Sequence, residues 1–129
     1  MSLNRRVFTQ SIAAAGVAAA APALADGKTI DVTMKNNPKA IFVPATVNCK
    51  VGDTVTWTNP GVITHSVTFD PAQAVTKDNV ALPAGVAPFD SGTMEQDGTY
   101  SHTFTVKGTY KYVCKFHEAM GMVGTVIVS

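Results

Sequence analysis

The rest of this chain is organised around the stretch Tyr110–Val128, which reads Y-K-Y-V-C-K-F-H-E-A-M-G-M-V-G-T-V-I-V. Its two ends, Tyr110–Cys114 and Val123–Val128, are rich in valine, threonine and tyrosine, which predicts two strands. The short loop between them contains a cysteine, a histidine and two methionines, at Cys114, His117, Met120 and Met122. Soft sulfur donors and an imidazole are therefore expected side by side between two strands of a sheet.

These donor types suit copper. A trigonal group of two histidines and one cysteine, with a weak axial methionine, is a site that passes single electrons. The loop has the spacing C-x2-H-x4-M and supplies one histidine, so the second must come from elsewhere in the chain. His65 begins another predicted strand, over residues 65–69, and can therefore lie at the same end of a sheet.

Short alternating segments occur along the whole domain, over residues 30–34, 41–43, 46–51, 54–58, 65–69, 100–106, 110–114 and 123–128. A period of two indicates half-buried strands. The region between Asp70 and Gly98 has no clear period, although a helical turn near Ala72 fits its sequence. We expect no helix longer than about two turns, and short strands at this spacing predict an all-β sandwich.

The first 25 residues predict a signal peptide rather than part of the domain. Arg5 and Arg6 precede an apolar run over 12–21 and the cleavage pattern Ala23-Leu24-Ala25. The paired arginines indicate the twin-arginine export route. A membrane anchor is the alternative, but the run is short for about 30 Å of hydrocarbon. We expect cleavage near Ala25, no stable membrane insertion afterwards, one domain over 26–129, and a periplasmic or otherwise exported protein.

The charge of that domain excludes one class of partner. Without Arg5 and Arg6, the 10 basic residues fall to 8, against 9 acidic residues, which gives a net charge of −1. Binding to nucleic acid requires a strongly basic face. We therefore expect no nucleic-acid partner.

Four segments together carry a resemblance to a known family. They are G-D-T-V-T-W-T-N at 52–59, T-H-S-V-T-F at 64–69, Y-S-H-T-F-T-V-K-G-T-Y-K-Y-V-C at 100–114 and H-E-A-M-G-M-V-G at 117–124. The chain resembles the small blue copper proteins, the plastocyanin, pseudoazurin and amicyanin family. This resemblance implies a cupredoxin-like Greek-key sandwich of about eight strands. It also implies one type 1 copper per chain, with His65, Cys114, His117 and Met122 as its ligands.

Two methionines compete for the axial position. Met122 has the spacing of plastocyanin and pseudoazurin, whereas Met120 has the shorter amicyanin spacing. We favour Met122, because an axial thioether contact is long and soft but is still set by the loop. Met120 would then lie on the surface beside His117.

Three further residues are expected to support the site. Phe116 stands where relatives commonly have proline, and its additional N–H is predicted to donate to the Cys114 sulfur. That bond would favour Cu(I), so Phe116→Pro should lower the reduction potential. Asn59 could tie the His65 loop to the Cys114 strand, although a simple turn role at Asn59-Pro60-Gly61 is equally compatible. Ser66 is the third candidate.

The second cysteine allows a different interpretation. A Cys49–Cys114 disulfide, with Trp57 between the cysteines and Tyr112 before the second, would resemble an immunoglobulin-like binding module without metal. That interpretation leaves both loop methionines and His117 unexplained. We expect Cys49 instead to pack as a small apolar side chain. His102 shares a strand face with aromatic residues and is expected to be structural rather than a ligand.

The expected function is single-electron transfer between redox proteins. All four coordination places are filled, which leaves no open position for a substrate, so we do not expect an enzyme. A cytochrome c, a dehydrogenase or a reductase would dock on a monomer near His117, over Phe116, Ala119 and Met120. Lys111, Lys115 and Glu118 would tune the encounter. A copper carrier or storage protein is the alternative function.

Overall fold

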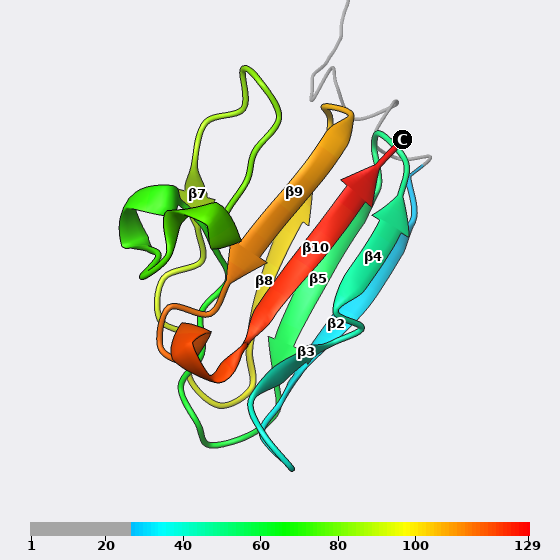
Figure 1. Cartoon of the computed structure of the whole chain (residues 1–129). Helices are drawn as coiled ribbons and strands as arrows, with labels where there is room; N and C mark the ends of the chain where they lie inside the picture. Colours follow the sequence, from blue (N-terminus) through cyan, green and yellow to red (C-terminus); the bar gives the residue numbers. More distant parts are fainter. Residues whose placement is uncertain (1–26) are drawn as a thin grey trace, which may run out of the picture.

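The computed structural model describes residues 27–129 and shows a β-sandwich (Figure 1). The predicted signal peptide, residues 1–25, lies outside the described residues. The described chain has nine strands and three short 3-10 helices, without an α-helix. The strands are β2 (Thr29–Lys35), β3 (Ile41–Val43), β4 (Thr46–Cys49), β5 (Thr54–Asn59), β6 (Thr68–Phe69), β7 (Phe89–Asp90), β8 (Gly98–Thr103), β9 (Gly108–Val113) and β10 (Val123–Val128). The helices are η2 (Pro71–Gln73), η3 (Lys77–Asn79) and η4 (Glu118–Met120).

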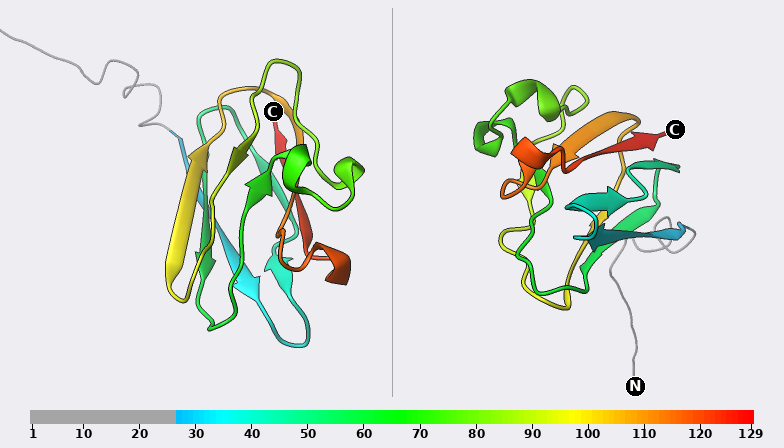
Figure 2. Two further views of the ribbon diagram at one scale, coloured as in Figure 1. Left: turned by 90° about the vertical axis from the view of Figure 1, so that its left-hand side faces the viewer. Right: turned by 60° about the horizontal axis from the view of Figure 1, so that its bottom comes forward.

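The strands form two sheets that pack face to face, as the turned views in Figure 2 show. One sheet has five strands in the order β4-β10-β9-β6-β7, and the other has four in the order β3-β2-β5-β8. The pairs β4–β10 and β2–β5 are parallel, while the other named pairs are antiparallel. The predicted Greek-key sandwich is confirmed, with nine strands in place of about eight.

Alternating side chains build the core between the sheets. In β5 every second residue is buried, including Val55 and Trp57. The indole Nε1 of Trp57 donates a 3.0 Å hydrogen bond to the hydroxyl of Tyr112 in β9, which links the two sheets through their aromatic side chains. Gly124 in β10 lies against the same ring, and a Cβ there would come within 2.3 Å of it. Glycine is therefore required where this tyrosine crosses the neighbouring strand.

The predicted strand over 65–69 is shorter than expected. His65 makes only an isolated bridge with Met94, and β6 begins at Thr68. The backbone N–H of Ser66 donates to the Cys114 sulfur, and that of Val67 donates to the hydroxyl of Ser91. Side chains rather than a neighbouring strand satisfy these donors, so the regular ladder starts later.

Two other predicted strands end early because their partner strands end. The 46–51 segment stops at Cys49, which pairs with Val128 at the end of β10. The 100–106 segment stops at Thr103, which pairs with Thr54 at the start of β5. Phe104 then exchanges hydrogen bonds with the turn before β5, and Val106 is 41% exposed.

Residues 70–80, the first part of the region without a clear period, form a strap beside β9 of the five-stranded sheet. Residues 70–80 contain η2 and η3, drawn in green beside β9 in Figure 1, and the expected helical turn near Ala72 is η2. Strand β7, at Phe89–Asp90, was not predicted, because a two-residue strand shows no period. No helix among residues 27–129 is long and apolar enough to cross a membrane.

Candidate metal centre

One end of the sandwich collects the predicted donors. The β9–β10 loop, the segment after β5 and the β2–β3 connection all lie at this end, which is the lower end in Figure 1. We call it the ligand end. The opposite end carries the β4–β5 turn and the carboxyl terminus (Figure 1).

Three of the four predicted ligands converge there. The Cys114 Sγ lies 3.4 Å from His117 Nδ1 and 3.6 Å from His65 Nδ1. All three donor atoms lie within 4.8 Å of one another, and no other group of three or more cysteine, histidine or acidic residues in the described chain could hold a metal ion. Cys114 and His65 are fully buried, whereas His117 is partly exposed.

The spacing of these atoms fits one bound ion. Nitrogen and sulfur donors lie about 2.0–2.3 Å from a borderline-soft metal ion, so three of them around it stand roughly 3.5 Å apart. The two distances from the Cys114 sulfur, 3.4 and 3.6 Å, agree with this value. The donor set of one thiolate and two imidazoles is also the one that copper prefers.

The two methionines of the loop have opposite environments. Met122 is fully buried, and Met120 is 60% exposed. The Met122 carbonyl accepts a hydrogen bond from the Cys114 N–H at 3.0 Å, and the Met122 N–H donates to the His117 carbonyl at 3.2 Å. Met122 is thus held between two of the converging residues, which favours it over Met120 as the fourth ligand.

Backbone hydrogen bonds fix the loop in a series of tight turns. The N–H of His117 donates to the Cys114 carbonyl at 3.1 Å, and the N–H of Met120 donates to the His117 carbonyl at 3.0 Å. Gly121 ends η4 with a φ of 88°, a conformation that glycine adopts at little cost. These backbone hydrogen bonds fix the spacing of the donors within the loop.

An unpredicted residue orients His65. The Oδ1 of Asn36, in the β2–β3 connection, lies 2.6 Å from His65 Nε2. This contact leaves Nδ1 facing the Cys114 sulfur, and such partners set the tautomer and orientation of metal-binding histidines. Burial lowers the pKa of His65, and the neighbouring His117 lowers it further, which favours the neutral imidazole that a metal needs.

The predicted hydrogen bond to the sulfur has a different donor. Ser66 donates its backbone N–H to Cys114 Sγ at 3.4 Å, and within residues 27–129 Phe116 forms no such bond. The Ser66 hydroxyl also accepts the N–H of Lys115 at 3.0 Å, so Ser66, which was expected only to support the site, joins the two segments that carry the predicted ligands. Phe116 is 47% exposed, which places its ring on the surface.

Asn59 supports the site less directly than predicted. Its side-chain amide donates to the carbonyls of Ile63 and Met94 at 2.7 and 3.0 Å, and its Oδ1 accepts the N–H of Gly61. Asn59 thus links the loop before His65 to Met94, the residue that forms the isolated bridge with His65. Of the two roles left open for Asn59, the turn role at Asn59-Pro60-Gly61 is the one observed, and the tie to the Cys114 strand is wrong.

Glu118 is not a surface charge, contrary to the expectation that it tunes encounters. It is only 6% exposed, and its carboxylate accepts hydrogen bonds from the N–H groups of Val75 and Thr76 and from the side chain of Asn79. Burial raises the pKa of Glu118, but the three hydrogen bonds outweigh that effect and leave the pKa below its usual value.

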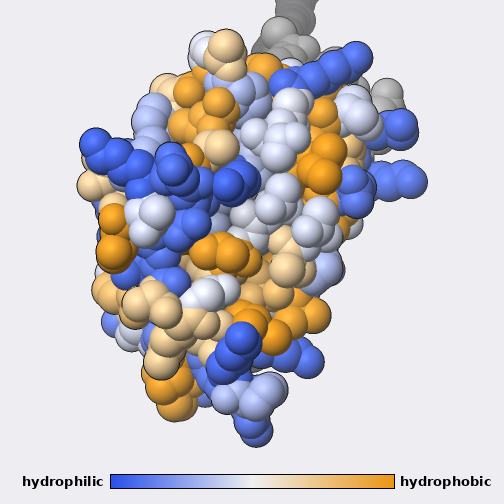
Figure 3. All heavy atoms as spheres, viewed as in Figure 1, coloured by the Kyte–Doolittle hydropathy of each residue, from blue (hydrophilic) through white to orange (hydrophobic). Residues whose placement is uncertain are grey.

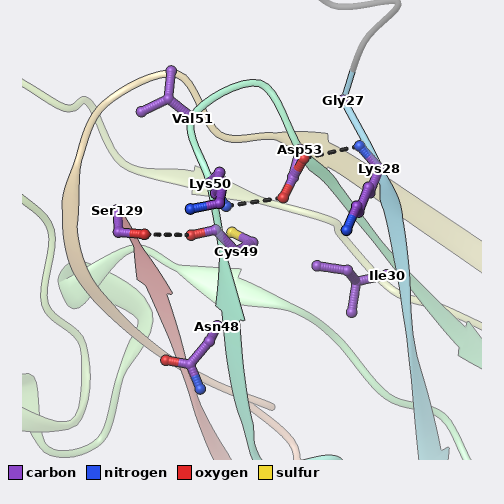
Figure 4. A pocket seen from close by; sticks show the side chains of 9 residues that line it. All are labelled: Gly27, Lys28, Ile30, Asn48, Cys49, Lys50, Val51, Asp53 and Ser129. Atoms are coloured by element: carbon purple, nitrogen blue, oxygen red, sulfur yellow. Dashed lines mark hydrogen bonds between the residues drawn. The ribbon is translucent and has the colours of Figure 1, made fainter.

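The remaining candidate residues lie away from the cluster. Both cysteines are free, and Cys49 lines a cavity of about 560 Å³ at the opposite end (Figure 4), so the disulfide interpretation is wrong. His102 stacks on Phe89 with ring centroids 3.8 Å apart and does not join the donor cluster. Its position agrees with the structural role that we expected.

Comparison with known proteins decides the family. Residues 23–129 match the family described as copper binding proteins, plastocyanin/azurin family. The chain belongs to this plastocyanin/azurin family. It is 38% identical over 121 residues to the chloroplastic plastocyanin of Tetradesmus obliquus, and the alignment covers 89% of this chain and 78% of that protein. It is 33% identical over 101 residues to the plastocyanin of Scenedesmus fuscus, covering 76% and 99% respectively.

Solved structures of the family confirm the cupredoxin-like sandwich. A reduced amicyanin with a proline-to-phenylalanine substitution matches with a TM-score of 0.60 and 34% identity, covering 78% of this chain and 82% of that one. A Sinorhizobium pseudoazurin matches with a TM-score of 0.61 at 24% identity, covering 79% and 74%, which supports the fold alone. Family membership and the converging donors together identify copper as the cofactor of this plastocyanin/azurin family member.

Proposed function

We propose that this protein carries single electrons between redox partners and that His65, Cys114, His117 and Met122 hold its copper ion. The observation that carries the proposal is the buried Cys114 sulfur lying 3.4 and 3.6 Å from two imidazole nitrogens. Copper, when bound, would supply a one-electron couple between Cu(I) and Cu(II).

The chain contributes a donor set that its own hydrogen bonds hold in place. The Asn36 contact holds the His65 ring, and backbone turns hold His117 between Cys114 and Met122. The Ser66 N–H points at the sulfur, where it stabilises the negative charge of a thiolate. Because these contacts do not depend on the oxidation state of an ion, the protein need rearrange little during electron transfer.

Access for a partner is expected at His117, which is the partly exposed histidine of the cluster. Exposed apolar side chains occur on the loops of the ligand end, and Figure 3 shows apolar surface over the lower part of the molecule. On the β9–β10 loop and the segment after β5, the exposed large apolar side chains are Val62 (75%), Met120 (60%), Phe116 (47%) and Ile63 (43%). A small, weak interface suits brief contacts with a cytochrome c, a dehydrogenase or a reductase.

Charge near this surface would adjust the encounter rather than the affinity. Lys111 is exposed, and Lys115 is partly exposed beside Asp90 at 3.6 Å. We propose that the protein acts as a monomer in the periplasm after cleavage near Ala25. The basic and apolar composition of residues 1–25 supports this location.

A copper carrier or storage protein is the rival function. Two fully buried donors, His65 and Cys114, oppose it, because metal held by them would leave slowly. The same filled donor set argues against an enzyme, which needs an open coordination position.

A visible absorption spectrum tests the proposal. Mature protein with one equivalent of Cu(II) should show an intense thiolate-to-copper band that ascorbate removes and an oxidant restores, with the copper retained throughout. The absence of the band would contradict the proposed ligands. Transfer of copper to an acceptor protein without any redox cycling would support the rival instead.

A further inference from the structure

The strap formed by residues 70–80 is attached to the ligand loop through one buried side chain. Glu118 follows His117 directly, and it is only 6% exposed. Oε1 accepts the N–H of Val75 at 2.6 Å, and Oε2 accepts the N–H of Thr76 at 2.9 Å and the Asn79 side chain at 2.9 Å. These partners are 39 to 43 residues away in the sequence, so the contact joins two separate parts of the fold.

These hydrogen bonds are of the strong kind. A carboxylate that accepts from several N–H donors forms short charge-assisted bonds, and burial removes competing water. The other link between the strap and the loop is weaker. Lys115 Nζ reaches Gln73 at 3.0 Å and Asp90 at 3.6 Å, but it is partly exposed, and exposed pairs contribute little.

The loop is therefore held on both sides of His117. On one side the Lys115 N–H donates to the Ser66 hydroxyl, which belongs to the segment that carries His65. On the other side Glu118 is held by the strap. Between these two attachment points the His117 carbonyl accepts the N–H groups of Met120 and Met122. A displacement of Glu118 would thus move both His117 and Met122.

We propose that Glu118 is a positioning residue for the metal centre, which keeps His117 and Met122 in place by locking the ligand loop to the strap. This inference rests on the proposed ligand set. It assigns to the strap a role in holding copper, although no strap residue lies in the donor cluster.

Glu118→Gln is the direct test, because it removes the charge and replaces one acceptor oxygen with an NH₂ group, which cannot accept hydrogen bonds from the N–H donors of the strap. Asp78→Asn is the matched control, since it removes one charge from an exposed residue of the same strap without a side-chain bond to the loop. Asn79→Ala removes one of the three hydrogen bonds without changing the ligand loop. It keeps the test decisive even if Glu118→Gln fails to fold.

The first measurement is hydrogen exchange of the Val75 and Thr76 amides in metal-free protein, which should be faster in Glu118→Gln and unchanged in Asp78→Asn. The second is copper release to a chelator, together with the visible spectrum. Loss of partners outside the ligand set typically costs about 10–100-fold in metal affinity. We expect release at least about tenfold faster and an altered band in Glu118→Gln, with a smaller change in Asn79→Ala.

Faster amide exchange with unchanged copper release and an unchanged band would overturn the inference, because Glu118 would then only stabilise the strap. If Glu118→Gln does not fold, an Asn79→Ala protein that releases copper like the wild type would overturn it equally. A wild-type protein without a thiolate-to-copper band would instead defeat the proposed function itself, so the two failures are distinguishable.

Discussion

The two ends of the sandwich each contain a free, buried cysteine, but in different surroundings. Cys114 at the ligand end is fully buried beside two imidazoles and receives the Ser66 N–H. Cys49 at the opposite end is 6% exposed and lies on the inward face of β4. Burial raises the pKa of the Cys49 thiol, and the negative charge of Asp53 raises it further. Burial alone therefore does not distinguish the proposed copper ligand from the structural cysteine. The neighbouring donor groups make that distinction.

Each end also contains a buried carboxylate that accepts backbone N–H groups. Glu118 holds the strap against the ligand loop, whereas Asp53 accepts the N–H of Lys28 at 2.8 Å and that of Lys50 at 2.9 Å (Figure 4). Asp53 thereby ties the start of β2 to the β4–β5 turn. The same interaction serves the metal centre at one end and only the fold at the other.

The largest difference between the ends should appear when the two cysteines are replaced separately. Cys114→Ser should abolish the thiolate-to-copper band completely, because the band requires a sulfur bound to copper. Cys49→Ser should leave the band intact and lower only the stability, since a polar hydroxyl replaces a small apolar side chain in the core. Visible spectra of the two copper-loaded variants check this, and a band lost in Cys49→Ser would show that Cys49 also takes part in copper binding.

Replacement of Asn36 should weaken the ligand end by a smaller amount. Asn36→Ala leaves the His65 ring without its partner at Nε2, so copper affinity should fall by about 10–100-fold. Asn37→Ala, in the same connection and exposed, is the control. Competition with a chelator measures both, and equal affinities for the two variants would show that Asn36 does not position His65.

The loop methionines should differ in a still subtler way. Met122→Gln should shift the visible band and the reduction potential, because the axial ligand tunes both without supplying most of the binding. Met120→Gln should change neither, since Met120 is 60% exposed. Spectra and voltammetry of both variants test this, and a shift confined to Met120→Gln would reverse the assignment.

The smallest effect is expected at the opposite end. The two backbone hydrogen bonds hold the pKa of Asp53 below its usual value, against the opposing effect of its burial. The stability contributed by this charge is thus present above the unfolded pKa of about 4 and is lost as the pH falls through the lower folded pKa. Asp53→Asn should lower the unfolding temperature of metal-free protein at neutral pH, and the difference from wild type should shrink below about pH 4.

Asp31→Asn, at an exposed position of β2, is the control for this experiment. A stability difference that stays constant down to pH 2 would contradict the role of the Asp53 charge. The copper band at neutral pH should be the same in both variants, because Asp53 lies at the opposite end from the donor cluster.

Much of this architecture could be predicted from the sequence, because the relevant patterns are local. The alternation in β5 and β10 and the donor spacing in the β9–β10 loop are contained in short segments. The supporting contacts are not local. Asn36 meets His65 across 29 residues, and Ser66 meets Cys114 across 48, so no window of sequence contains both partners.

The errors have the same origin. In the sequence, Glu118 looks like an ordinary surface charge. It is buried only because the strap packs against the ligand loop in the folded chain. The N–H of Phe116 is close to the sulfur in sequence, but the N–H of Ser66 is the one that reaches it in space. Strand β7 depends entirely on its pairing with β6, since two residues carry no periodic signal.

The most direct test of the central claim is an anomalous-diffraction map, recorded at the copper absorption edge, from crystals of the copper-loaded protein. The proposed copper site predicts one strong peak within bonding distance of Cys114 Sγ, His65 Nδ1 and His117 Nδ1, with the sulfur of Met122 as the longer fourth contact. A peak beside Cys49 at the opposite end, or copper bound without the Cys114 sulfur, would contradict it.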